Sequence, residues 1–250
     1  MSMHIVGYET SASEAALTQI VPIPDGTVVI GGANDIRVPV GMNNICFAAG
    51  MINSATATLR QQIRTPSLLG KWPYDIAPLA NGLVFGSLPP CLRQWQTPTK
   101  LVENESMQVY VQNGAAVMNR LFAIFCDGAT KSVSGQVLTM RATGAAATAT
   151  ASWVNSSLTL SSVLPSGTFQ HVGTRAWSAN GCAYRMFYVG GIWRPGGLMG
   201  NAESNLEWPD FRWGNIGVWG QFTNINPPSM DFMGITDTAQ TVYLDLIQTA

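Results

Sequence analysis

The chain has 250 residues, of which 11% are charged and 46% hydrophobic, and its formal net charge at pH 7 is −1. Soluble domains ordinarily carry about 25% charged residues, so small and uncharged polar residues replace charge here. Because interspersed charge normally keeps a free monomer soluble, this composition favours a surface largely covered by copies of the same chain. A lightly charged monomer is the simpler alternative.

The composition and the apolar runs also exclude several partners. Phosphate neutralisation needs convergent Lys or Arg side chains, and the 13 basic residues form no cluster, so we expect no direct nucleic-acid binding. Residues 1–14 lack the basic and apolar regions of a secretory signal. The longest mostly apolar run, 76–88, contains Pro78 and is shorter than the ~18–20 residues of a membrane-spanning helix.

The cysteine pattern predicts neither a zinc site nor a disulfide framework. Cys46, Cys91, Cys126 and Cys182 form no C-x-x-C pair, which a zinc knuckle would need. Cys46 and Cys126 lie inside apolar runs, so we expect both to be small core residues. No cofactor or bound metal is predicted.

The first half of the chain is typical of short β-strands separated by Gly, Pro and Asn turns. Only 11–17 has the residue types that start a helix, and no long amphipathic helical pattern follows. The run 121–126 is continuously apolar, as in a strand buried on both faces. Strands are expected at 27–30, 36–40, 45–49, 59–64, 83–85, 107–111 and 121–126.

After Asp127-Gly128 the strand pattern starts again. Turn residues recur about every ten residues, which is the spacing of a sandwich or a jelly roll. The strands expected in this half are 136–142, 149–154, 158–160, 168–172, 185–189, 216–222 and 241–247.

Four weak motif matches between the halves occur in the same order, which predicts two copies of one unit of ~125 residues. We therefore predict an all-β chain of two consecutive eight-stranded jelly rolls, at 1–130 and 131–250, with few short helices. The matches pair 24–27 with 165–168, 45–47 with 184–187, 64–68 with 194–198, and 108–111 with 241–244.

Catalytic machinery is not evident in the sequence. A hydrolase nucleophile needs a nearby base, usually histidine, but only His4 and His171 are present, and no G-x-S-x-G elbow occurs. His171 alternates with Phe169 in a strand-like run and is predicted to be structural. Residues 28–35 superficially resemble a dinucleotide-binding loop, yet they lack the third glycine and a following helix.

One acidic cluster invites a glycosidase interpretation. Glu203, Glu207 and Asp210 lie beside Trp208 and Trp213, and paired carboxylates perform glycoside hydrolysis. Some such cluster is expected by chance among 14 acids in 250 residues, and the spacing does not match a calcium loop. We therefore predict that the chain is not an enzyme.

The stretch 182–222 holds four of the eight tryptophans and eight of the 25 glycines. It reads as a wide apolar surface with polar edges, and 194–197 (Arg-Pro-Gly-Gly) forces a turn. Tryptophan and arginine are frequent interface anchors; the alternative is that the tryptophans fill the core of the second sandwich. The predicted interface residues are Trp193, Arg194, Trp208, Trp213 and Trp219.

The paired P-x-G-T, R-x-P or R-P, and Q/T-V-Y-V/L elements, together with two β-rich units and low charge, resemble the double jelly-roll major capsid proteins of tailless icosahedral viruses of bacteria and archaea. The resemblance covers nearly the whole chain, but it lies in the layout and not in a specific signature. It implies two sandwiches per chain and pseudo-hexagonal homotrimers that tile an icosahedral shell.

The same resemblance implies a virion protein, made in the host cytoplasm, whose main partner is itself. Minor capsid or vertex proteins and an internal membrane are further partners of such families. Two other classes remain open from the residues alone. One is a carbohydrate-binding β-sandwich or lectin-like module, in which exposed tryptophans stack on sugars, and the other is a phage tail or fibre protein.

Overall fold

The computed structural model describes residues 2–52, 58–69, 74–76, 79–80, 91–93, 98–116, 118–128, 133–144, 152–200, 213–214, 217–234 and 239–249. These residues form several β-sheets with one short helix among them, so the all-β prediction is confirmed. Pairing between the described strands is antiparallel, apart from a parallel contact of β9 with β6.

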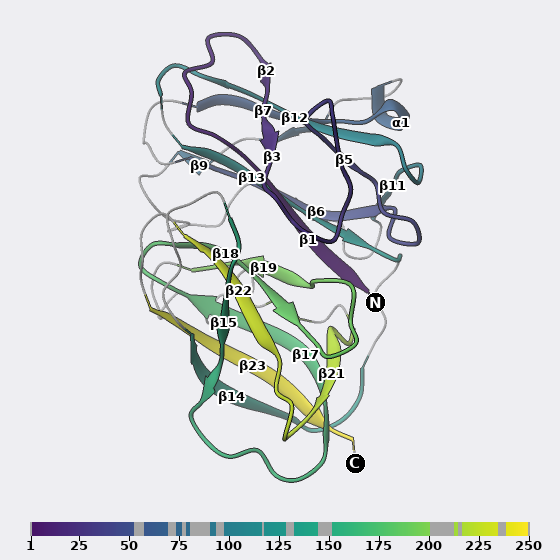
Figure 1. The fold of residues 1–250 in the computed structure, drawn as a ribbon, viewed down its shortest axis with the longest axis vertical. Helices are drawn as coiled ribbons and strands as arrows, with labels where there is room; N and C mark the ends of the chain where they lie inside the picture. The colour runs from purple at the N-terminus through teal and green to yellow at the C-terminus, as the bar shows by residue number, and fades with distance from the viewer. Residues whose placement is uncertain are drawn as a thin grey trace. The chain divides into compact units, whose positions relative to one another are not determined.

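The chain divides into two compact units. The N-terminal unit is His4–Ala129, and the C-terminal unit consists of Thr130–Ala250 with Met1–Met3. Figure 1 draws the first from purple to teal and the second from teal to yellow.

Two sheets make up the N-terminal unit. The first has the order β10-β6-β13-β1-β3, with β9 and β11 also on β6, and the second has the order β4-β5-β12-β7-β8, with β2 on β12. Its elements are β1 (Met3–Thr10), β2 (Thr18–Gln19), β3 (Val21–Pro22), β4 (Ile30–Gly31), β5 (Asp35–Arg37), β6 (Asn44–Ile52), β7 (Thr58–Arg64), α1 (Pro66–Leu69), β8 (Tyr74–Ile76), β9 (Leu79–Ala80), β10 (Cys91–Arg93), β11 (Thr99–Lys100), β12 (Ser106–Asn113) and β13 (Asn119–Cys126).

Two sheets also make up the C-terminal unit. Their orders are β16-β14-β23-β17-β20, with β21 on β17, and β15-β22-β18-β19. The strands are β14 (Val137–Gly144), β15 (Val154–Ser157), β16 (Thr159–Leu160), β17 (Thr168–Trp177), β18 (Gly181–Phe187), β19 (Gly196–Leu198), β20 (Trp213–Gly214), β21 (Gly220–Thr223), β22 (Ser229–Gly234) and β23 (Gln240–Gln248).

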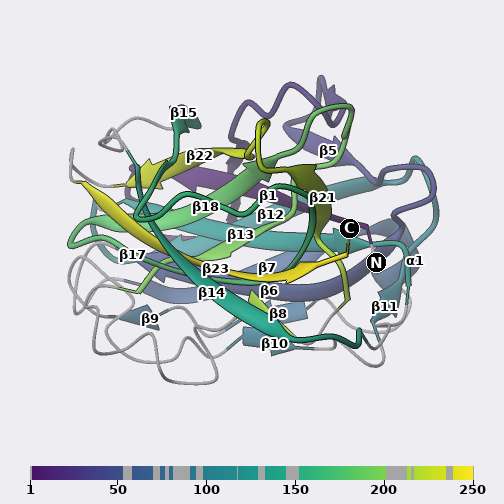
Figure 2. The ribbon, with the colours of Figure 1, turned by 90° about the horizontal axis from the view of Figure 1, so that it is seen from below.

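The strand order is the same in the two units. The last strand lies beside the first in each, because β13 is between β1 and β6, and β23 is between β14 and β17; Figure 2 shows β23 flanked in this way. In the other sheet, β12 lies between β5 and β7, and β22 lies between β15 and β18. The main strands of the two units therefore alternate between two sheets in the same order along the chain.

Burial along the central strands follows the sequence pattern. All eight residues of β13 are buried: the six of the apolar run 121–126, as expected, and also the polar Asn119 and Arg120. In β12 the burial alternates, with Met107, Val109 and Val111 inside, because successive side chains point to opposite faces of a strand. Cys46 and Cys126 are buried free thiols, so the core prediction for both is confirmed.

Two expected local structures are wrong. Residues 11–17 form no helix, because the Asn113 amide donates to the Ala12 carbonyl and accepts from the Glu14 backbone N–H, which holds the segment against β12 as an irregular connection. Residues 27–29 form a turn and not a strand, because the Asp25 carboxylate accepts the backbone N–H groups of Thr27 and Val28 at 2.9 and 3.1 Å. The expected strand at 83–85 lies outside the described residues.

One tyrosine hydroxyl joins the two sheets of the N-terminal unit. Tyr8, on β1, is fully buried; its hydroxyl donates to the Met107 carbonyl at 2.5 Å and accepts from the Ile36 N–H at 3.1 Å. It therefore satisfies backbone groups on β12 and β5 from the opposite sheet. Burial also raises the pKa of this phenol well above its ordinary value, which keeps it a hydrogen-bond donor.

We predict that Tyr8→Phe destabilises the protein by about 1–3 kcal/mol, because a buried donor and a buried acceptor lose their partner. The measurement is the midpoint of urea unfolding at neutral pH. Tyr110→Phe is the matched control: Tyr110 is half-buried, and within the described part of the chain its hydroxyl bonds only the Gln108 side chain. Equal losses in the two variants would contradict a special role for the Tyr8 hydroxyl.

Candidate functional site

The candidate site is built on the turn formed by residues 188–195, which connects β18 to β19 and is called the 188–195 turn below. The strands around it pair Arg185 with Gly196. Gly190 has φ +78, a conformation that L side chains rarely adopt, and the Gly191 N–H donates to the Tyr188 carbonyl at 2.9 Å. A tight turn therefore starts directly after β18.

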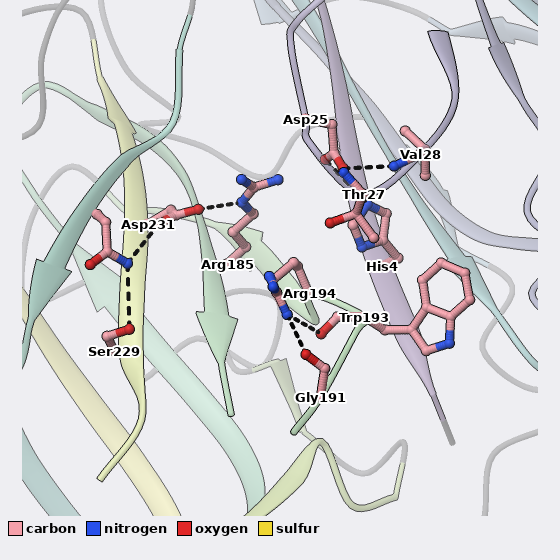
Figure 3. Close-up of polar contacts among 11 residues, drawn as sticks. His4, Asp25, Thr27, Val28, Arg185, Gly191, Trp193, Arg194, Ser229 and Asp231 are labelled. Atoms are coloured by element: carbon pink, nitrogen blue, oxygen red, sulfur yellow. Dashed lines mark hydrogen bonds and ion pairs between the residues drawn. The ribbon is translucent and has the colours of Figure 1, made fainter. Parts of the chain in front are cut away.

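Arg194 holds the turn from within. Its Nη1 donates to the carbonyls of Gly191 and Trp193 at 2.7 and 3.4 Å, and its guanidinium lies 3.8 Å from the centre of the Phe187 ring. Figure 3 shows the two carbonyl contacts and the Trp193 indole pointing away from the guanidinium. The cation is thus fixed by backbone dipoles and an aromatic face.

Apolar side chains project from the 188–195 turn into solvent. Val189 is 85% exposed and Ile192 is 65% exposed, while the neighbouring Trp193 is half-buried. Single exposed apolar residues are common on protein surfaces, but here they gather on one rigid turn beside a pocket. We call Val189 and Ile192 the apolar tip.

The pocket beside the apolar tip has a volume of about 440 Å³. Trp219 lines it and is only 6% exposed, because it packs 5.3 Å from the His171 ring and lies parallel to Tyr184 at 6.5 Å. The Trp219 indole N–H is buried and has no hydrogen-bond partner among the described residues. The residues of the apolar tip also line the pocket, and the further lining residues are Ser2, Met3, Tyr188, Gly190, Gly191, Trp193, Pro195, Val218, Gly220 and Gln221.

A buried hydrogen-bonded histidine supports the floor of the pocket. His171 Nε2 lies 2.7 Å from the Gly173 carbonyl, which can only accept, so Nε2 carries the proton. The remaining ring nitrogen, Nδ1, then accepts a hydrogen bond from the Tyr188 hydroxyl. The contacts fix one neutral tautomer and orient Tyr188 at the pocket wall.

Burial keeps this network uncharged. It lowers the pKa of His171 from 6.5 to about 4, although the Gly173 carbonyl and the Asp245 carboxylate act in the opposite direction. The pKa of the Tyr188 phenol is raised well above its ordinary value by the same desolvation. Both rings are therefore neutral at physiological pH, and neither is placed to exchange a proton with solvent.

A row of hydrogen-bonded polar side chains, Arg185, Asp231 and Asn155, crosses the neighbouring strands β18, β22 and β15. Arg185 Nε donates to Asp231 Oδ2 at 2.6 Å, and the Asn155 amide donates to Asp231 Oδ1 at 2.9 Å; Figure 3 shows the ion pair. The Arg185 guanidinium also lies 4.7 Å from the Trp153 ring. The Arg185 charge is therefore paired inside the unit, and these contacts link the three strands.

The second histidine is also structural. In the N-terminal unit, His4 Nε2 lies 3.1 Å from Asp25 Oδ1, and both side chains are buried. Asp25 additionally caps the turn at Thr27 and Val28 (Figure 3). The residues that the structure describes contain no cluster of three metal-ligating side chains. They also include no helix long and apolar enough to cross a membrane.

The structure brings two of the five predicted interface residues to the pocket wall. These are Trp193, half-buried, and Trp219, largely buried; Arg194 lies next to them within the turn. Trp208 and the acidic cluster Glu203, Glu207 and Asp210 lie outside the described residues, and of Trp213 only the strand β20 is described. The apolar tip was missed, because 185–189 was predicted as a strand and β18 ends at Phe187.

Among the described residues, the pocket is lined by aromatic side chains and by the backbone of the turn. His171 and Tyr188 are buried and neutral, the Arg194 cation is held within the turn, and the apolar tip faces outward. The comparisons with known proteins give no matching family model, no similar curated protein and no similar solved structure.

We predict that His171 makes stability fall as the pH falls from 6.5 to about 4. In this range the unfolded chain binds a proton at His171 and the folded chain does not, so acidification favours unfolding, by up to about 3 kcal/mol. His171→Gln removes the titration and keeps one donor and one acceptor. The measurement is the unfolding free energy in urea between pH 4 and 7, compared between the two proteins.

The expected result is a shallower pH dependence for His171→Gln, since other groups titrate equally in both proteins. Parallel curves would show that His171 takes up its proton with an ordinary pKa in the folded protein.

Proposed function

We propose that the chain is a structural protein that assembles with copies of itself: a double jelly-roll capsid protein whose trimers tile an icosahedral shell. The observation that carries the proposal is the common strand order of the two units. In a jelly roll, eight strands alternate between two sheets, and the last strand returns beside the first. The strand orders of both units are compatible with this scheme.

A chain with two similar units can form pseudo-hexagonal contacts from a trimer. Three chains present six similar lateral units, so one sequence can serve both threefold and near-sixfold neighbours. Closed rings require head-to-tail or self-complementary surfaces. A low charge content of 11% suits surfaces that are covered after assembly.

The apolar tip and its pocket are the proposed contact surface. Val189 and Ile192 are exposed on a turn that Arg194 keeps rigid, so little conformational entropy would be lost when a neighbouring copy covers them. The pocket beside the tip supplies an apolar surface with polar edges. Partners beyond the chain itself, such as vertex proteins, follow only from the resemblance.

A carbohydrate-binding module is the second candidate, because the pocket has two tryptophans in its wall. Stacking on a sugar needs an exposed ring face, however, and Trp219 is 6% exposed with Tyr184 parallel to it. Of these two tryptophans, Trp193 alone is exposed enough to act as a platform. Titration with a panel of oligosaccharides tests this candidate directly, and saturable binding that Trp193→Ala abolishes would favour it over assembly.

We predict that the purified protein has a native mass near three times 26.8 kDa and that Ile192→Asp lowers it to the mass of one chain. A buried unpaired carboxylate at a packed contact is strongly unfavourable, whereas at a solvent-exposed tip it costs nothing. Light scattering measures the mass, and negative-stain imaging shows whether shells or hexagonal particles form.

Val163→Asp is the matched control. Val163 is 94% exposed in the same unit and lies outside the pocket lining, so its replacement is expected to leave the mass unchanged. A wild-type protein that stays monomeric at high concentration would overturn the proposed function.

A further inference from the structure

A second pocket, of about 280 Å³, opens on the surface of the N-terminal unit, beside the paired strands β7 and β12. It contains the Arg64-Thr65-Pro66 segment at the end of β7. Its lining combines polar side chains with apolar surface, to which Pro66 and the Tyr110 ring contribute. The lining residues are Arg64, Thr65, Pro66, Ser106, Gln108 and Tyr110.

The Arg64 guanidinium is held on two sides. It lies 4.0 Å from the centre of the Tyr110 ring, and its Nε and Nη2 donate to Gln62 Oε1 at 3.0 and 2.8 Å. The strand register explains the geometry: Gln108 is opposite Arg64 and Tyr110 is opposite Gln62, so Arg64 and Tyr110 are diagonal neighbours on one face. The cation is preorganised before any ligand arrives.

The side of the guanidinium that remains is the edge formed by Nη1 and the second Nη2 hydrogen. This edge has the fork geometry that carboxylates accept. No carboxylate among the described residues pairs with Arg64. Glu105, the acidic residue directly before β12, instead accepts hydrogen bonds from the backbone and hydroxyl of Ser67 and from the Val102 N–H.

We propose that this pocket binds a carboxylate group. The free Arg64 edge forms two hydrogen bonds to the carboxylate oxygens, and the Ser106 hydroxyl and the Gln108 amide are the additional polar groups of the lining. Pro66 provides an apolar wall for the ligand's carbon chain. The lining has one cation, which matches the single charge of one carboxylate group better than the two charges that a phosphate carries on one group.

A sugar fits this pocket less well than a carboxylate. The aromatic residue of the lining, Tyr110, has a ring face covered by the Arg64 guanidinium, so that face is not free to stack on a pyranose. The carboxylate itself has two possible sources, namely a small free acid or an acidic side chain of another copy. The site does not depend on the assembly proposed above.

The test is calorimetric titration of the full chain with glutarate in low salt, with the neutral diamide glutaramide as the control ligand. We expect glutarate to bind with a Kd on the order of 1 mM, as a single charged fork contact allows, and glutaramide not to bind. Arg64→Gln is expected to weaken glutarate binding at least tenfold, and Arg64→Lys, which keeps the charge without the fork, nearly as much.

Arg60→Gln is the matched control, since Arg60 is an exposed residue of β7 outside the pocket. Its replacement removes the same charge and should change the Kd less than twofold. The native mass of the variants distinguishes a small free acid from an acidic side chain of another copy. A loss of mass in Arg64→Gln but not in Arg60→Gln identifies a carboxylate of another copy, which would also block glutarate. An unchanged mass with lost glutarate binding identifies a free acid.

The proposal is overturned if Arg64→Gln changes neither glutarate binding nor native mass relative to the wild-type protein. It is also overturned if Arg60→Gln weakens glutarate binding as much as Arg64→Gln does, because loss of one positive charge anywhere on β7 would then explain the weaker binding.

Discussion

Each unit depends on one constraint, the pairing of its last strand between two strands that come much earlier in the chain. β23 pairs along its length with β14 on one side and β17 on the other. Until this strand is in place, the edge of β17 opposite β20 and β21 lacks a partner, and burial of His171, which β17 carries, is incomplete. The neutral hydrogen bond to Tyr188, and with it the wall of the pocket, therefore requires long-range closure of the unit. Such non-local pairing is slow to form, but it holds the 188–195 turn on a completed sandwich.

Strand identity could be predicted from the sequence, while strand partnership could not. The alternation in 107–111 and the apolar run in 121–126 report burial, which is local to each strand, and both strands form as expected. The motif matches fail as a guide to topology: 108–111 lies in β12 and its match 241–244 in β23, although by strand order β12 corresponds to β22. A strand-like tetrapeptide indicates which face of the strand is buried, but it does not indicate which other strand pairs with it. Only 64–68 and 194–198 fall in equivalent connections, after β7 and β18.

The same distinction applies to the site. Trp193, Arg194 and Trp219 were predicted from residue type alone, and their environments in the structure differ. Trp193 lies at the pocket wall, Arg194 lies inside the turn, and Trp219 lines the pocket while packing against His171. Exposure of Val189 and Ile192 depends on where β18 ends, and that is decided by the backbone of Gly190 and by the hydrogen bond from Gly191 to Tyr188. These are tertiary and turn effects that no local pattern of apolar residues specifies. An interface role for the tryptophans stays a prediction.

Several of the few charged residues are paired inside the units and do not reach the surface. Arg120 is fully buried and its Nε lies 2.5 Å from Glu9 Oε2, while Arg185 and Asp231 form a second pair that is almost inaccessible to water. Buried pairs add little net stability compared with apolar residues, although removing one partner is costly. Their formation leaves still fewer charges to keep the surface soluble than the 11% of the composition suggests. A surface this poor in charge, with a rigid apolar tip, is more readily reconciled with a covered subunit than with a free monomer.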